Sequence, residues 1–68
     1  MSVYRVTDII GTSSKSWEDA AREALSTAAE SLRDLRVAEV VAQDIALGED
    51  GAISAFRTKL RVSFKYEK

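Results

Sequence analysis

A row of cations in the last third of the chain has the spacing and charge to recognise an anion. Arg57, Lys59, Arg61 and Lys65 alternate with other residues in the segment ISAFRTKLRVSFKY. Because side chains alternate between the two faces of a strand, these cations would share one face. Such a row can bind an anionic ligand such as a phosphate or a nucleotide. It can equally form ion pairs with Glu39 and with acidic residues of neighbouring chains, and the sequence leaves both alternatives open.

The residue types that the chain lacks exclude most other site chemistry. It has 68 residues, no Cys and no His. Disulfides, thiolate metal sites and the commonest ligand of transition metals are therefore excluded. No nucleophile lies beside a recognisable base, so we expect no enzymatic activity. The chemistry that remains is a carboxylate and carbonyl site for a hard cation, or self-association.

Charge and hydropathy argue against two further classes of partner. The formal net charge is −1, from 10 basic and 11 acidic residues, and this charge does not favour binding to nucleic acid. The aromatic residues of 53–66 alternate onto the face opposite the cations, where they cannot stack bases beside them. No apolar run reaches the length of a membrane span. We therefore expect a cytoplasmic protein that binds neither nucleic acid nor membrane.

Four elements must position these side chains, and we expect them to form a single α+β domain over residues 1–68. Segments rich in β-branched residues predict three strands, and Gly11 is expected to end the first. Apolar residues at helical spacing predict one amphipathic helix, with Ser13 or Ser14 as the expected N-cap, and Ser16 with Asp19 also matches the spacing of a capping box. The expected ranges are 3–10 for the first strand, 15–34 for the helix, 36–47 for the second strand and 53–66 for the third.

The connections between these elements determine the expected topology. The helical crossover makes the first and second strands parallel, and the GEDG turn at 48–51 makes the third strand antiparallel to the second. The third strand then lies between the other two. We therefore predict a β-α-β-β protomer in which a three-stranded antiparallel sheet of order 1-3-2 packs on the helix.

The second strand, LRVAEVVAQDIAL, is apolar on both faces, although so short a chain can cover only one face of a sheet. If the hairpin places Glu39 opposite Arg61, the second face also carries Gln43 and is too apolar to suit open water. We expect other copies of the chain to cover it. The predicted assembly interface consists of Val37, Glu39, Val41, Ile45 and Arg61.

The order and spacing of several segments resemble the dodecin family over about residues 3–66. The segments are VYRVTDIIGTSSKSWEDAAREAL, then AEVV in the second strand and VSF in the third. The resemblance implies a β-α-β-β protomer that assembles into a hollow homododecamer. It also implies storage or buffering of flavins such as riboflavin and FMN, bound as stacked pairs at subunit interfaces, and some bacterial members bind coenzyme A.

Two positions depart from the pattern of the flavin-binding dodecins. The family's stacking tryptophan corresponds to Val37, and the family's flavin-binding glutamine corresponds to Arg57. Valine has no π face, and arginine offers donors only. The resemblance therefore places the cofactor pocket at Val37 and Arg57, with Lys59 as a neighbour, and implies that flavin stacking is lost or weak.

The pattern is closer to a divergent branch, the calcium dodecins, through MSVYRVTDIIGTS, SWEDAA, RVAEV and QD followed by an apolar run. This branch implies the same assembly with bound calcium. Ca²⁺ takes about six to eight oxygen ligands, and GEDG lacks the spacing of an EF-hand, so we expect ligands from symmetry mates. Asp8 and Asp44 interrupt strand-like segments and are the candidate metal ligands; the alternative is that each pairs with a neighbouring Arg or Lys.

The function predicted from the sequence is therefore non-enzymatic binding or storage by a homododecamer, with calcium as the ligand. The alternative is a flavin or coenzyme A storage dodecin with a reshaped pocket. A third hypothesis is a shell whose interfaces are purely structural.

Overall fold

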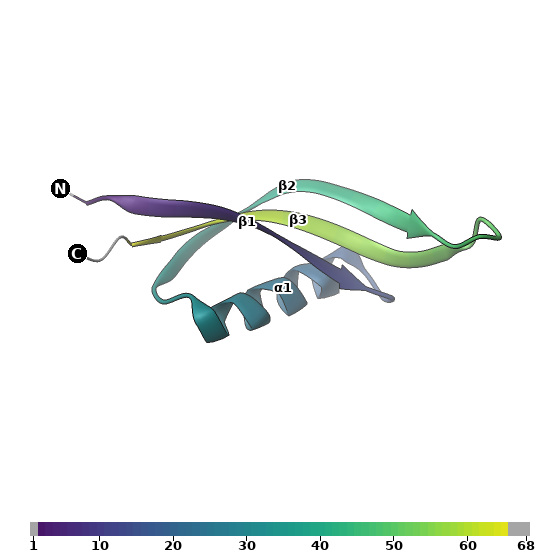
Figure 1. Cartoon of the computed structure of the whole chain (residues 1–68), viewed down its shortest axis with the longest axis horizontal. Helices are drawn as coiled ribbons and strands as arrows, with labels where there is room; N and C mark the ends of the chain where they lie inside the picture. The colour runs from purple at the N-terminus through teal and green to yellow at the C-terminus, as the bar shows by residue number, and fades with distance from the viewer. Residues whose placement is uncertain (1, 66–68) are drawn as a thin grey trace.

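The computed structural model describes residues 2–65 and has the predicted topology. Strand β1 is followed by helix α1 and by the hairpin of β2 and β3, and β3 lies between β1 and β2, antiparallel to both (Figure 1). The α+β class and the sheet order 1-3-2 are thus confirmed. The elements are β1 (Tyr4–Ser13), α1 (Trp17–Ser31), β2 (Leu35–Leu47) and β3 (Ile53–Lys65).

The first strand is longer than predicted, because Gly11 does not end it. Gly11 pairs with Thr58 inside β1 and is buried. A Cβ at this position would lie 2.0 Å from the carbonyl oxygen of Ala20 and 2.8 Å from the Cβ of Ala24. The glycine therefore allows the helix to lie directly on the strand.

The other element boundaries differ from the expected ranges by a few residues. The prediction of Ser13 or Ser14 as the N-cap was wrong: the helix begins after Ser16, whose hydroxyl accepts a hydrogen bond from the backbone N–H of Asp19 at 3.0 Å. It ends at Ser31, three residues earlier than expected, and Asp34 takes a positive φ of 57° in the link to β2. Tyr66, the predicted end of the third strand, lies outside the described residues.

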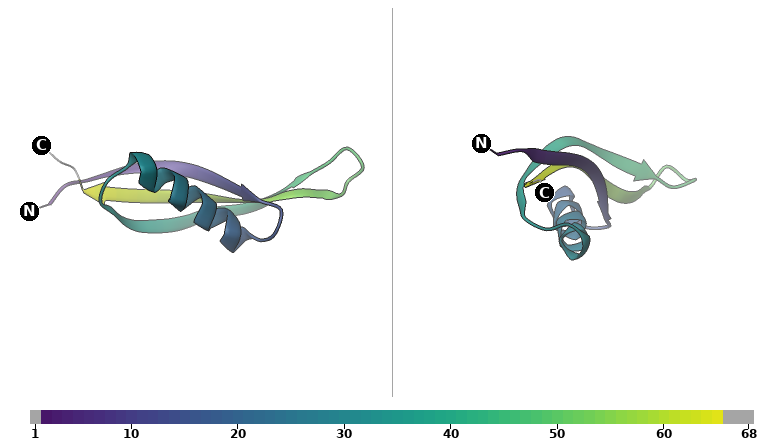
Figure 2. Two further views of the ribbon diagram at one scale, coloured as in Figure 1. Left: turned by 90° about the horizontal axis from the view of Figure 1, so that it is seen from below. Right: turned by 60° about the vertical axis from the view of Figure 1, so that its left-hand side comes forward.

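The core lies between α1 and the helix side of β3. Leu60 and Val62 are almost fully buried there against Ala24, and the Thr58 hydroxyl donates a hydrogen bond to the carbonyl oxygen of Trp17 at 2.8 Å. The helix packs mainly on β1 and β3, and the hairpin of β2 and β3 extends beyond it (Figure 2). The opposite side of the sheet, which we call the outer face, has no element packed on it among residues 2–65.

A β-bulge in β2 overturns part of the predicted face assignment. Glu39 lies opposite Arg61, as expected, but the register shifts between Val40 and Ala42. The extra residue of a bulge reverses the alternation beyond it. The prediction that Gln43 and Ile45 share the face of Val37 and Glu39 was therefore wrong. They lie opposite Thr58 and Phe56, on the helix side of the sheet.

Candidate functional site

The predicted row of cations lies on the outer face, along the central strand β3. The register places Asp8 of β1 opposite Arg61 and Asp44 of β2 opposite Arg57. Residues directly opposite each other on antiparallel strands point to the same face. The two carboxylates therefore flank the cations from the two edge strands.

Each of the two carboxylates forms a bidentate ion pair with an arginine. Arg57 donates from Nε to Oδ1 of Asp44 at 2.7 Å and from Nη2 to Oδ2 at 2.9 Å. Arg61 contacts Asp8 in the same way, at 2.9 and 3.1 Å, and Nζ of Lys59 lies 3.9 Å from Oδ2 of Asp8. Within one chain, Asp8 and Asp44 therefore each pair with a neighbouring cation, which is the alternative to metal binding that the sequence left open.

These ion pairs keep both carboxyl groups ionised. Hydrogen bonding from Arg61 lowers the pKa of Asp8 below its ordinary value of 3.8; desolvation opposes this shift, and the charges of Arg61 and Lys59 add to it. Hydrogen bonding from Arg57 lowers the pKa of Asp44 in the same way; desolvation again opposes the shift, and the charge of Arg57 adds to it. The pKa of Arg61 is raised by its bond to Asp8, with a smaller contribution from the charge of Glu39.

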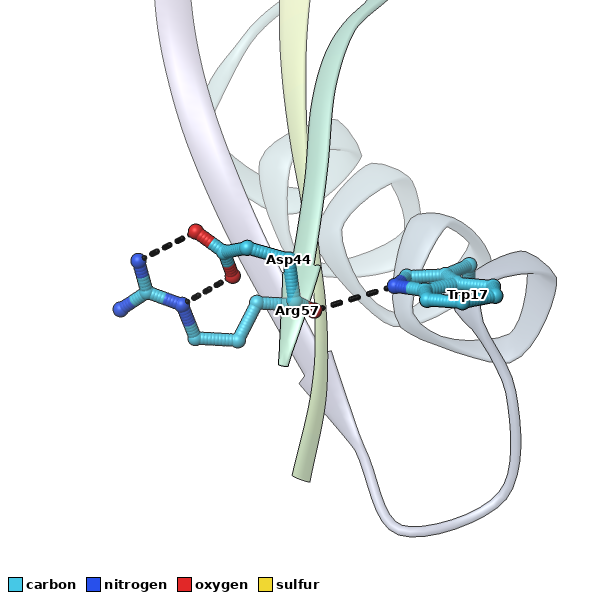
Figure 3. Close-up of polar contacts among 3 residues, drawn as sticks. All are labelled: Trp17, Asp44 and Arg57. Atoms are coloured by element: carbon cyan, nitrogen blue, oxygen red, sulfur yellow. Dashed lines mark hydrogen bonds and ion pairs between the residues drawn. The ribbon is translucent and has the colours of Figure 1, made fainter. Parts of the chain in front are cut away.

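Trp17 fixes the backbone of Asp44 from the helix side of the sheet. Its indole N–H donates a hydrogen bond to the Asp44 carbonyl oxygen at 3.0 Å, and its ring meets Phe56 edge to face, with centroids 5.2 Å apart. Figure 3 shows Asp44 between the indole on one side and the Arg57 guanidinium on the other. Sequence reasoning missed this link. The one available signal was that an indole N–H needs an acceptor, and nothing local identifies an acceptor 27 residues away.

The structure does not bring the predicted cofactor-pocket residues together within one chain. Val37 lies opposite Ser63, whereas Arg57 is six residues away along β3. At about 3.3 Å per residue, this separation is roughly 20 Å. Val37 is 63% exposed on the outer face, and Lys59 lies beside the Asp8 pair. A pocket that includes both Val37 and Arg57 would need more than one copy.

The same reasoning applies to the candidate metal ligands. The partners of Asp8 and Asp44 on β3 are four residues apart, which corresponds to about 13 Å along the strand. Among residues 2–65, no three acidic side chains gather closely enough to hold a metal ion. Carboxylate oxygen is the right donor for Ca²⁺, but one chain does not supply enough of it at one place.

A groove of about 720 Å³ lies elsewhere, between α1 and β1. Its lining includes Ile9, Gly11, Glu23, Thr27 and Leu32, and it contains none of the predicted site residues.

The helix of the described chain is too short and too polar to cross a membrane.

Comparisons with known proteins agree with this fold. The dodecin family model matches residues 3–67. The calcium dodecin of Mycobacterium tuberculosis is 57% identical over 65 residues, which cover 96% of this chain and 90% of that protein. Its crystal structure, described as that of a calcium-chelating antigen with a novel calcium-binding site, superposes with a TM-score of 0.86 at 55% identity, covering 97% of this chain and 93% of that one.

Dodecins from two Streptomyces species are also similar in structure. The Streptomyces davaonensis protein has a TM-score of 0.89 at 33% identity, and the match covers 98% of this chain and 97% of that protein's chain. The Streptomyces coelicolor protein has a TM-score of 0.91 at 33% identity, with coverages of 98% and 94%. Matches of this extent in both sequence and structure show that the chain belongs to the dodecin family.

Proposed function

We propose that this chain is a calcium-binding dodecin that assembles into a homododecamer. The observation that carries the proposal is the 57% identity, over nearly the whole chain, to a protein named calcium dodecin. The proposed role is binding and storage of the cation rather than catalysis. A cytoplasmic location stays a prediction from the sequence.

The outer face supports self-association. Its exposed apolar side chains come from both edge strands and are between 49% and 63% accessible: Tyr4, Val6, Ile10 and Val37. Apolar surface of this kind, broken by charged residues, is typical of an interface between protein chains. Among the described residues, β1 and β2 are each paired on one side only, so both edges are also available to another strand.

Calcium binding at such interfaces would resolve the shortage of ligands in a single chain. Asp8 and Asp44 lie on the outer face, about 13 Å apart along the sheet, so they would contribute to different sites. Each site would be completed by oxygen atoms from neighbouring copies. The metal would then stabilise the assembly, because a ligand that binds only the folded, assembled state favours it by mass action.

Native mass spectrometry of the purified protein tests this proposal. We expect the mass of twelve chains with an excess in steps of calcium, and a lower melting temperature after chelator treatment. A mass of one or two chains would contradict the assembly. A dodecamer that retains no calcium after calcium is added would contradict the proposed calcium binding. An excess in steps of a flavin or of coenzyme A would instead support the alternative storage role.

A further inference from the structure

The end of the β2–β3 hairpin projects beyond the part of the sheet that α1 covers (Figure 2). We call this part the arm and define it as residues 45–55. The helix begins at Trp17, which meets Phe56 and the backbone of Asp44 at the base of the arm. From there α1 runs back along β1 and β3, away from the arm, so the arm has no helix packed on it.

The register places three apolar side chains on the helix side of the arm. Ile45 lies on that side. Ala46 lies opposite Ala55 on the outer face, so the next residue of β2, Leu47, returns to the helix side. Leu47 pairs with Ile53, because the register skips one residue of β3 at this point, and directly opposed residues point to the same face. We call Ile45, Leu47 and Ile53 the arm face.

The arm face is exposed within the single chain. Its side chains are 40%, 64% and 57% accessible, in the order Ile45, Leu47 and Ile53. Two strands without a covering layer do not bury their own side chains, and a hairpin alone is marginally stable in water. The charged residues of the arm, Glu49 and Asp50, both lie in the turn at its tip. The arm face is therefore an apolar strip that requires cover from outside the chain.

The surface area and shape of the chain indicate that this cover is another protein chain. The accessible area is 5185 Å², whereas a compact monomer of 7.5 kDa exposes about 4,200 Å². The surplus of roughly 900 Å² is close to the 800 Å² or so that each partner contributes to a standard interface. The radius of gyration is 13.9 Å, against about 11 Å for a compact domain of this length. A small ligand could not cover so large a surplus.

We propose that the arm face binds a second copy of this chain, at a contact separate from the outer face. The proposal rests on the self-association that is part of the proposed function. A copy of the chain brings matching apolar surface, since Val37 on the outer face is 63% exposed and Val40 on the helix side is 54% exposed. Two separate contacts per chain also suit a closed shell, because one self-complementary surface alone ends at a dimer.

Cysteine labelling of the intact oligomer tests the contact, because the chain has no cysteine of its own. Ile53→Cys places the only thiol on the arm face, and Glu49→Cys places it in the turn, beside the charged Asp50. The rate of reaction with a maleimide is divided by the rate of the same variant unfolded in urea, which removes differences in intrinsic reactivity. We expect this ratio to be at least about tenfold lower for Ile53→Cys, because a buried thiol is inert.

A charge on the arm face tests the same contact by disruption. Leu47→Lys would bury an unpaired charge at the contact, so we expect native mass spectrometry to show a smaller oligomer than that of the wild type. Glu49→Lys carries the same new side chain two residues away in the turn and is expected to keep the wild-type mass. Leu47 is not part of the core between α1 and β3, and circular dichroism of the helix verifies that each variant is folded.

The outcomes distinguish this inference from the proposed function. A wild-type mass of one chain contradicts the self-association itself. A dodecamer in which the thiols of Ile53→Cys and Glu49→Cys give equal ratios leaves the proposed function in place and overturns the arm contact. An unchanged oligomer mass for folded Leu47→Lys overturns it as well. If Leu47→Lys does not fold, the thiol ratios decide alone.

Discussion

The substitution Gly11→Ala tests whether the contact between α1 and β1 depends on a missing side chain. The added Cβ would lie 2.0 Å from the carbonyl oxygen of Ala20, and ordinary contact begins at 3.4 Å. The gap between strand and helix must therefore widen by roughly 1.4 Å. Both sides of this contact are backbone or near-backbone atoms, so no flexible side chain can move aside.

The expected cost follows from the consequences of overpacking. One extra methyl group in a filled core costs about 1–3 kcal/mol, and a clash with backbone belongs at the upper end of that range. The widened gap also loosens the packing of Ala24 on Leu60 and Val62. For a chain of this size, each 1 kcal/mol lowers the melting temperature by about 4–8 °C. We therefore expect a decrease of roughly 10–25 °C.

Thermal denaturation followed by circular dichroism, at one fixed protein concentration, measures this decrease. Gly48→Ala is the matched control, because its Cβ would meet the flexible carboxylate of Asp50 at 3.3 Å and the carbonyl oxygen of Ala52 at an ordinary contact distance of 3.7 Å. Gly51→Ala adds a case of backbone strain without a clash, since Gly51 has a φ of 82° and open space around it. The reasoning is refuted if Gly11→Ala melts within a few degrees of Gly48→Ala.

Three further predictions concern other parts of the fold. Ser16→Ala removes the hydroxyl that caps α1 and is expected to cost about 1 kcal/mol in urea denaturation, whereas Ser16→Asp should restore most of it. Because folding lowers the pKa values of Asp8 and Asp44, the unfolded chain takes up protons at a higher pH than the folded chain does as the pH falls. The stabilisation from the two ion pairs is therefore present above about pH 4 and is lost as the pH falls through the lowered pKa values. Melting temperatures measured against pH should therefore fall less steeply in the Asp8→Asn/Asp44→Asn double variant than in the wild type, and equal slopes would contradict these ion pairs. Deletion of Val41 removes the extra residue of the bulge and leaves Asp44 opposite Arg57 on the outer face, so we expect size-exclusion chromatography to show the same oligomer as the wild type; loss of the assembly would contradict the observed register.

The sequence by itself was sufficient to predict the order of the elements and their arrangement in the sheet. Apolar periodicity is a local property, so the helix and the three strands could be recognised from it. The crossover and the short turn then favoured the sheet order 1-3-2, which the structure confirms. The same alternation placed Arg57, Lys59 and Arg61 on one face; the pairing of Glu39 with Arg61, which the sequence offered only as a condition, is the one that the register shows.

Only the tertiary structure determined how the candidate site is built. The bulge at Val41 leaves no mark in the residue pattern, yet it places Asp44 on the outer face beside Arg57 and moves Ile45 to the helix side. Gly11 could be taken for the end of a strand until the helix was seen lying on it. Ion-pair partners and the acceptor of the Trp17 indole are fixed by contacts between strands and helix that are distant in the sequence. Local patterns carry no information about such contacts, because they depend on how whole elements pack against one another.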